Sequence, residues 1–145
     1  MNTKILWIED DYYNYQSLFK PLQRKGIEVD YALSALDGYK KALNWRQYAI
    51  IVADIILPPK REPGDLPDVV KGWEKEKYLG IGLLKWLIND LKVRCPVVIL
   101  SVVDNPIESF GLQDLGIADF VPKRGLLPSV LAQRILEQLK GGKEK

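Results

Sequence analysis

The sequence predicts an α/β fold in which one doubly wound, five-stranded parallel sheet is covered by five helices. Short apolar runs rich in β-branched residues alternate along the chain with longer segments of helical periodicity. The runs over 4–8, 49–53 and 96–100 are almost continuously apolar, which is typical of strands that are buried on both faces. At 145 residues and 47% hydrophobic, the chain can bury one sizeable core. We therefore expect a single domain over residues 1–145.

The first half of the chain has a βαβαβ pattern. The expected elements are a strand over 4–8, a helix over 12–25, a strand over 27–32, a helix over 34–45 and a strand over 48–53. Gly26 is a stop signal for the first helix, and Pro21 predicts a kink inside it. Ser34 is a typical cap for the second helix.

The second half repeats the alternation. The expected elements are a helix over 82–91, a strand over 96–100, a helix over 104–115, a strand over 117–121 and a helix over 128–140. Asp104 followed by Pro106 indicates one helix start, and Pro128 indicates another. We expect residues 141–145 to be a flexible tail. Strict alternation implies right-handed crossovers, with helices on both faces of the sheet.

Residues 58–78 form an unusually long connection between the third strand and the helix that follows. This segment contains four prolines and ten charged residues, so we expect it to contribute little to the core. The simpler interpretation is a solvated excursion. The alternative is a lid, with Lys60 or Arg61 near the ends of the strands and Trp73 packing back onto the domain.

Composition excludes several classes of function. A net charge of +2 without a basic stripe argues against nucleic acid. The first residues turn acidic too soon for a signal peptide or a membrane span, so we expect a cytoplasmic protein. Cys95 is the single cysteine, which excludes an internal disulfide and a multi-cysteine zinc site. The absence of histidine excludes histidine triads, histidine metal ligands and a phosphohistidine on this chain.

Acidic residues follow two of the predicted strands. Glu9 and Asp10 come after the first strand, and Asp54 comes after the third. Open α/β sheets bind ligands in the crevice at these carboxyl ends. Two carboxylates about 4 Å apart repel by about 4 kcal/mol at an effective dielectric constant near 20, so such a cluster favours a cation. Hard oxygen ligands predict Mg²⁺.

Four motifs fall at the ends of the first, third, fourth and fifth predicted strands: the acidic pair in ILWIEDD, the acid in VADIILP, the hydroxyl in VVILS and the lysine in FVPK. In this combination the chain resembles a stand-alone response-regulator receiver domain of the CheY-like superfamily. The resemblance implies a flavodoxin-like sheet of order 2-1-3-4-5. It also implies a signalling module, not a classical enzyme, that takes a phosphoryl group from a sensor histidine kinase or phosphotransfer protein.

The resemblance also assigns roles to the acids. Asp54 would be the nucleophile that accepts the phosphoryl group, where the ordinary interpretation is a strand-end cap. Asp10 would bind Mg²⁺ directly and Glu9 through a water, with Asp54 and the backbone carbonyl of Ile56 completing the protein ligands. Asp11 more simply faces solvent and caps the first helix.

Three further residues have implied roles. Lys123 would bind the phosphoryl oxygens, although a lysine after a strand is usually a surface residue. Ser101 would turn its hydroxyl toward the phosphoryl group, where the ordinary interpretation is a helix cap. Phe120 occupies the position of the aromatic residue that acts as a switch in the family. The ordinary interpretation is that it is a residue of the hydrophobic core. Receivers commonly contact partners through the fourth helix, fifth strand and fifth helix, here residues 104–139, so an effector protein or a second copy is expected there.

Two departures from the family pattern, besides the long connection, affect the site. Arg124 follows Lys123 where the family has proline, which predicts either a trans bond with a shifted lysine or visible strain. Val102 stands where the family has a small residue and should narrow access, slowing phosphorylation by small donors and hydrolysis. These features keep open a pseudo-receiver, a binding module that is not phosphorylated. Flavin binding is disfavoured by the acidic EDDYYNY segment, and a phosphohydrolase or nuclease by Ile56, where those folds need a second acid.

Overall fold

A computed structural model describes residues 3–58, 66–73 and 77–143, and within these ranges it contains one five-stranded parallel sheet. The strand order is β2-β1-β3-β4-β5, as expected for the flavodoxin-like fold. The strands are β1 (Lys4–Ile8), β2 (Glu28–Ala32), β3 (Ile50–Ala53), β4 (Val97–Ser101) and β5 (Asp119–Pro122). The predicted fold class and sheet order are confirmed.

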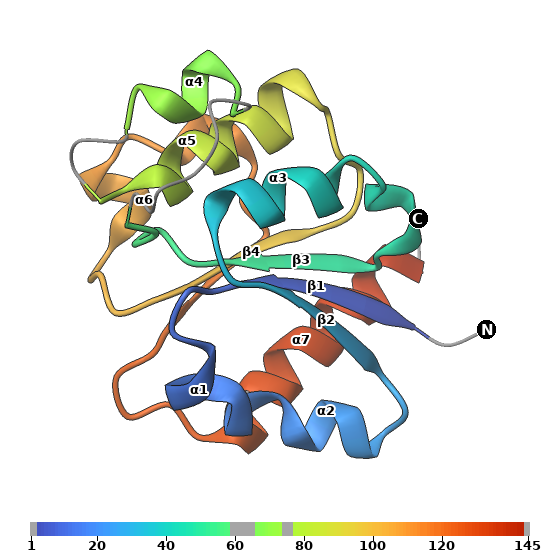
Figure 1. The fold of residues 1–145 in the computed structure, drawn as a ribbon. Helices are drawn as coiled ribbons and strands as arrows, with labels where there is room; N and C mark the ends of the chain where they lie inside the picture. Colours follow the sequence, from blue (N-terminus) through green and yellow to red (C-terminus); the bar gives the residue numbers. More distant parts are fainter. Residues whose placement is uncertain (1–2, 59–65, 74–76, 144–145) are drawn as a thin grey trace.

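Helices cover both faces of the sheet (Figure 1). One layer contains α3 (Ala35–Ala42), α4 (Asp68–Lys71), α5 (Leu79–Lys85) and α6 (Pro106–Ser109). The opposite layer contains α1 (Tyr12–Tyr15), α2 (Lys20–Arg24) and α7 (Pro128–Lys143). Short 3₁₀ turns lie at Gln16–Phe19, Trp45–Gln47 and Gln113–Leu115, and a wider π turn at Trp86–Asp90 continues α5. No helix in the described ranges is long and apolar enough to cross a bilayer.

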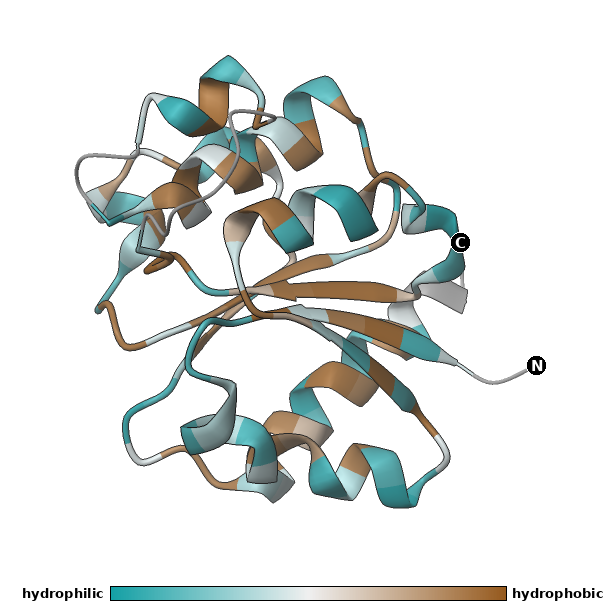
Figure 2. Cartoon of the chain, viewed as in Figure 1, coloured by the Kyte–Doolittle hydropathy of each residue, from teal (hydrophilic) through white to brown (hydrophobic). Residues whose placement is uncertain are grey.

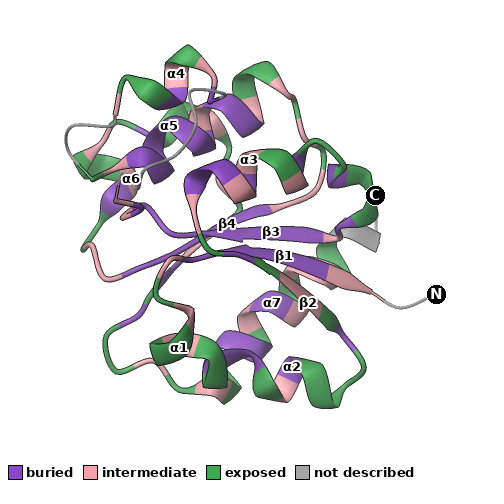
Figure 3. Cartoon of the chain, in the orientation of Figure 1, coloured by how far each residue is buried: buried purple, intermediate pink, exposed green. Residues whose placement is uncertain are grey.

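The sheet separates two apolar cores. Neighbouring residues of a strand point to opposite faces, so Leu6 and Ile8 pack under α3 and α5, whereas Ile5 and Trp7 pack against the layer that contains α7. The central strands are consequently apolar along their length (Figure 2) and buried (Figure 3). This double burial explains why β1, β3 and β4 lack polar alternation, whereas the edge strand β2 contains Glu28 and Asp30 and is only partly buried.

The first predicted helix is interrupted, as Pro21 led us to expect. It consists of α1, a 3₁₀ turn and α2, and Pro21 lies in the first turn of α2. At that position the missing N–H of proline costs no helical hydrogen bond. Gly26 ends the segment with a φ of +84°, as the sequence predicted.

The predicted helix over 104–115 is wrong in length and in its cap. Helix α6 covers only Pro106–Ser109, and Asn105, with a φ of 49°, precedes it in place of Asp104. Gly111 then adopts a φ of +62°, a left-handed conformation that ends the helix. Phe110 packs its ring against Tyr78, with ring centroids 5.2 Å apart, so a tertiary contact holds this early turn.

The expectation that residues 58–78 contribute little to the core is wrong for the described part of this segment. Leu66 and Val70 are buried in the core cluster that includes residues of α5, and Trp73 packs against the same cluster. Helix α5 begins at Leu79, earlier than the expected Gly82. Lys60 and Arg61 lie outside the described residues.

The C-terminal helix is longer than predicted. Helix α7 continues to Lys143, past the expected end at Lys140. Of the expected flexible tail, residues 144–145 lie outside the described part of the chain.

Candidate functional site

Backbone hydrogen bonds extend the sheet by one residue at the carboxyl ends of three strands. The N–H of Glu9 donates to the carbonyl of Ala32, and the N–H of Asp54 donates to that of Ile8, at 2.9 and 3.1 Å. The N–H of Lys123 donates to the carbonyl of Ser101 at 2.9 Å. Parallel strands in register therefore bring Glu9, Asp54 and Lys123 together by backbone geometry.

The three predicted acids form one cluster. One carboxylate oxygen from each of Glu9, Asp10 and Asp54 lies within 4.8 Å of the others. Glu9 and Asp54 are buried, and Asp10 is half-buried. Asp11 is exposed and precedes α1 as expected, but its carboxylate caps no backbone N–H and instead accepts from the Asn14 amide at 2.8 Å.

Lys123 lies between two of these acids. Its ammonium donates to Asp54 Oδ2 at 2.7 Å and also contacts Glu9 Oε1. Only 3% of the lysine side chain is exposed, so the ordinary interpretation of a surface lysine is wrong. The Lys123–Arg124 bond is trans, since the described residues contain no cis peptide, and the side chain still reaches Asp54.

The other oxygen of Asp54 has a backbone partner. Ile56 N–H donates to Asp54 Oδ1 at 3.1 Å, which fixes the rotation of the carboxylate. A cavity of about 270 Å³ lies over this group, lined by Glu9, Asp10, Asp11, Tyr15, Asp54, Ile56, Val102 and Lys123. With roughly 30 Å³ for one water, this space suffices for a phosphoryl group and several waters. Val102 lines it, as the hypothesis of narrowed access requires.

The charges of the site are unbalanced. Burial, together with the nearby Asp54 carboxylate, raises the pKa of Glu9 to about 8, although Lys123 acts in the opposite direction. Burial alone would lower the pKa of Lys123, but Asp54 and Glu9 outweigh it and raise the pKa. One ammonium therefore compensates three carboxylates only in part.

The donor set fits a magnesium ion. All three side chains offer hard carboxylate oxygens, and Mg²⁺ is bound in proteins by one or two carboxylates with several waters. Glu9 Oε1 is buried, and among the described residues no hydrogen bond of normal geometry reaches it, despite its contact with Lys123. Glu9, Asp10 and Asp54 are the residues that could hold the ion.

Ser101 and Phe120 lie just outside the cavity. Ser101 is the last residue of β4 and is fully buried, and its hydroxyl accepts from the N–H of Val103 at 3.3 Å. It does not cap α6, which begins after Asn105. Phe120 is half-buried against the core on the α5 side of the sheet.

Tyr15 is a site residue that the sequence did not reveal. Its ring lines the cavity, and its centroid lies 4.1 Å from the Lys123 ammonium. Helical spacing indicated only that Tyr15 lies on the buried side of the first helix. The available signal was the aromatic-rich EDDYYNY segment directly after the acids.

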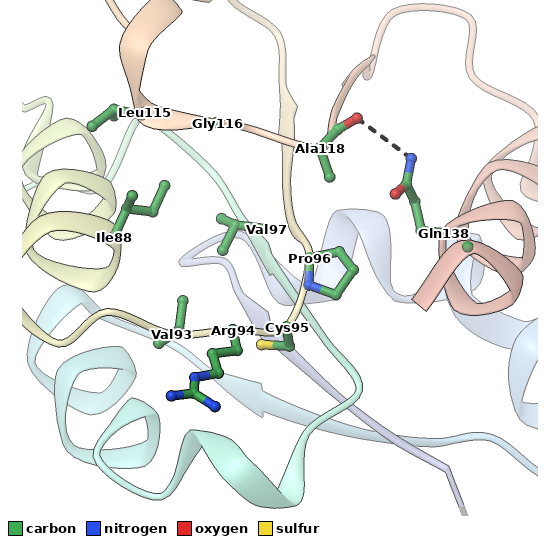
Figure 4. Close-up of a pocket in the computed structure, with 11 residues that line it drawn as sticks. Ile88, Val93, Arg94, Cys95, Pro96, Val97, Leu115, Gly116, Ala118 and Gln138 are labelled. Atoms are coloured by element: carbon green, nitrogen blue, oxygen red, sulfur yellow. Dashed lines mark hydrogen bonds between the residues drawn. The ribbon is translucent and has the colours of Figure 1, made fainter. Parts of the chain in front are cut away.

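A larger cavity of about 560 Å³ lies away from this chemistry, where β4 and β5 begin (Figure 4). The Gln138 amide crosses its edge and donates to the Ala118 carbonyl at 3.4 Å. Arg94 and Cys95 also line it, and burial raises the pKa of the Cys95 thiol to about 11. A protonated thiol at neutral pH is a poor nucleophile, so this cavity is not a candidate reaction site.

Comparisons with known proteins agree with this geometry. A CheY-like response regulator receiver domain protein from Methanospirillum hungatei superposes with a TM-score of 0.74 and 22% identity, covering 99% of this chain and 98% of that one. A two-component response regulator from Clostridium difficile has a TM-score of 0.69 and 27% identity, covering 96% and 97%. The resemblance inferred from the four strand-end motifs is confirmed.

Sequence searches reach less of the chain. Hybrid signal transduction histidine kinase G from Dictyostelium discoideum is 42% identical over 57 residues, which are 38% of this chain and 2% of that protein. The match therefore spans a very small part of this relative's length. No family model matches the sequence.

Proposed function

We propose that this chain, which has the fold of response-regulator receiver domains, accepts a phosphoryl group on Asp54 from the phosphohistidine of a sensor histidine kinase or phosphotransfer protein. The placement of Asp54 carries the proposal. Its carboxylate is buried beneath a small cavity, with Lys123 on one oxygen and two further acids nearby. A buried carboxylate cluster with an incompletely compensated charge is costly, and such sites are typically functional.

The reaction follows from the partners of Asp54. A carboxylate oxygen of Asp54 attacks the phosphorus in line, the bond from phosphorus to the imidazole nitrogen breaks, and the imidazole leaves with the electron pair. Lys123 moves from Asp54 Oδ2 to a phosphoryl oxygen, while the Ile56 N–H keeps the carboxylate oriented. Mg²⁺, bound by Asp10, Asp54, the Ile56 carbonyl and, through a water, Glu9, would neutralise charge on the phosphoryl group.

The signal would leave the site through protein contacts. Once Asp54 is modified, the Ser101 hydroxyl would exchange the Val103 N–H for a phosphoryl oxygen and draw the β4–α6 loop inward, and Phe120 would follow. The surface formed by α6, β5 and α7 would then meet an effector protein or a second copy. We propose a cytoplasmic setting for these contacts, as well as slow self-dephosphorylation.

Intact-mass measurement tests the proposal. Wild type, Asp54→Asn and the matched control Asp11→Asn are incubated with Mg²⁺ and a small phosphoryl donor. We expect one base-labile phosphoryl group on wild type and on Asp11→Asn, and none on Asp54→Asn. Equal labelling of Asp54→Asn would exclude Asp54 as the acceptor. No label from small donors or from candidate histidine kinases would instead support the pseudo-receiver.

Val102 provides a second test of the cavity. Because it lines the space above Asp54, Val102→Ala should accept phosphoryl groups from small donors faster than wild type does, and should also lose them faster. Val103→Ala, on the same loop but outside the cavity lining, is the matched control. Unchanged rates in Val102→Ala would count against restricted access.

A further inference from the structure

The ammonium of Lys123 contacts an aromatic ring as well as two carboxylates. Glu9 and Asp54 contact it through carboxylate oxygens, and the ring of Tyr15 covers it at 4.1 Å. A cation within about 6 Å of an aromatic centroid is attracted by the ring quadrupole, most strongly where water is absent. With 3% of the lysine side chain exposed, this contact is desolvated.

The fold holds the Tyr15 ring in place. Tyr15 ends α1, and the 3₁₀ turn that follows buries Leu18 and Phe19 in the core beside α7. Phe19 in turn packs on Trp7 of β1, with centroids 4.1 Å apart. The tyrosine is therefore tied to the same strand that carries Glu9, and its distance from Lys123 is set by packed groups on both sides.

The other tyrosines of this region have different surroundings. Tyr12 stacks on Tyr31 with centroids 4.1 Å apart, and Tyr13 is 81% exposed. Of the three tyrosines of α1, only Tyr15 lines the cavity over Asp54. Its contact with Lys123 is thus specific to this position and is not a general consequence of an aromatic-rich helix.

We propose that Tyr15 is a positioning residue for Lys123. Its ring holds the ammonium at the side of the cavity next to Asp54 and keeps water from it, so that the charge reaches the phosphoryl oxygens already desolvated and oriented. This inference rests on the proposed function, in which Lys123 binds those oxygens. In this inference Tyr15 affects phosphoryl transfer only by positioning Lys123.

The experiment compares Tyr15→Leu, Tyr15→Phe and the exposed control Tyr13→Leu by two measurements. The first is NMR of lysine ε-methylene groups without any phosphoryl donor, with the Lys123 signal assigned by its loss in Lys123→Arg. The second is the rate of phosphoryl uptake from a small donor with Mg²⁺. Tyr15→Phe keeps the ring and serves as the conservative variant.

We expect a ring-current shift of the Lys123 ε-methylene signal in wild type, Tyr15→Phe and Tyr13→Leu, and its loss in Tyr15→Leu. Phosphoryl uptake should fall roughly tenfold in Tyr15→Leu and recover in Tyr15→Phe. A Lys123 signal that is unchanged in Tyr15→Leu, or uptake equal to wild type in that variant, would overturn the inference. If wild type itself takes no phosphoryl group, the proposed function fails, while the NMR result still decides whether Tyr15 holds Lys123.

Discussion

The acidic site, which contains Asp54 at the end of β3, and the segment over 58–78 that follows β3 are held by different interactions. Glu9, Asp54 and Lys123 are polar residues that backbone hydrogen bonds of the sheet place side by side. Leu66 and Val70 are apolar residues in a highly charged segment, and side-chain packing on the core places them. The site shows that sheet geometry can enforce an electrostatically costly cluster. The described part of the segment shows that a few apolar side chains can hold a highly charged connection against the core.

Helix α5 joins these two regions through two glycines. A Cβ on Gly80 would lie 2.1 Å from the Asp54 carbonyl oxygen. A Cβ on Gly82 would lie 2.7 Å from Val70 Cα in α4. One helix therefore packs closely against the backbone of the site and against the backbone of the segment.

Gly80→Ala should have the largest effect, because it separates α5 from the strand that carries Asp54. The added methyl group meets rigid backbone rather than a flexible side chain, and we expect a loss of about 3 kcal/mol or more in the free energy of unfolding. Urea denaturation measures the loss. Gly72→Ala is the control, since its Cβ would meet only ordinary contacts at 3.7 Å. Similar stability of the two variants would contradict this account of α5.

Val70→Ala tests whether the segment is part of the core while remaining separate from the chemistry. Val70 is fully buried, so removing two methyl groups should cost about 2 kcal/mol of unfolding free energy. Val69→Ala, at the half-buried neighbour, should cost less. Phosphoryl uptake under native conditions should stay unchanged in both. If Val70→Ala were as stable as wild type, the interpretation of this segment as a solvated excursion would be supported. A changed rate of phosphoryl uptake would instead support the interpretation as a lid.

The sequence predicted the sheet and the site far better than the helical layer between α4 and α6. Strand-end residues such as Asp54 and Lys123 take their places from a parallel register, which follows from short apolar runs. The end of α6 depends on Phe110 meeting Tyr78, and this contact leaves no local pattern in the sequence. The burial of Val70 was likewise not predicted, because the average composition of residues 58–78 is highly charged. Tyr15 was missed because its partner, Lys123, is distant in sequence.

The pH dependence of stability tests the electrostatic cost of the site. The pKa of Glu9 is raised from 4.5 to about 8, so between these pH values the folded protein binds more protons than the unfolded chain. Without metal, stability should therefore fall as the pH rises from 4.5 to 8. Each pKa unit corresponds to about 1.4 kcal/mol, so the fall should exceed 1 kcal/mol.

Glu9→Gln, which cannot titrate at this position, is the reference for that measurement. Denaturation in EDTA at pH 5, 6.5 and 8 should show wild type losing stability relative to Glu9→Gln. Adding Mg²⁺ should reduce the difference, because a bound cation favours the ionised carboxylate. Parallel profiles of the two proteins in EDTA would show that the buried acid is already fully compensated by Lys123.

The smallest expected effect concerns a contact between a lysine ammonium and an aromatic ring. Such a contact occurs both in the acidic site and at Trp73 of the segment over 58–78. Lys85 Nζ lies 5.1 Å from the Trp73 ring centroid, whereas Lys123 Nζ lies 4.1 Å from Tyr15. Lys85 and Trp73 are half-buried, so water competes for the ammonium, and Lys85→Met should cost only about 0.5 kcal/mol. Lys71→Met, at an exposed lysine of α4, is the control. If Lys85→Met cost as much as Val70→Ala, the segment would be held by charge as well as by its apolar anchors, and the contrast with the acidic site would weaken.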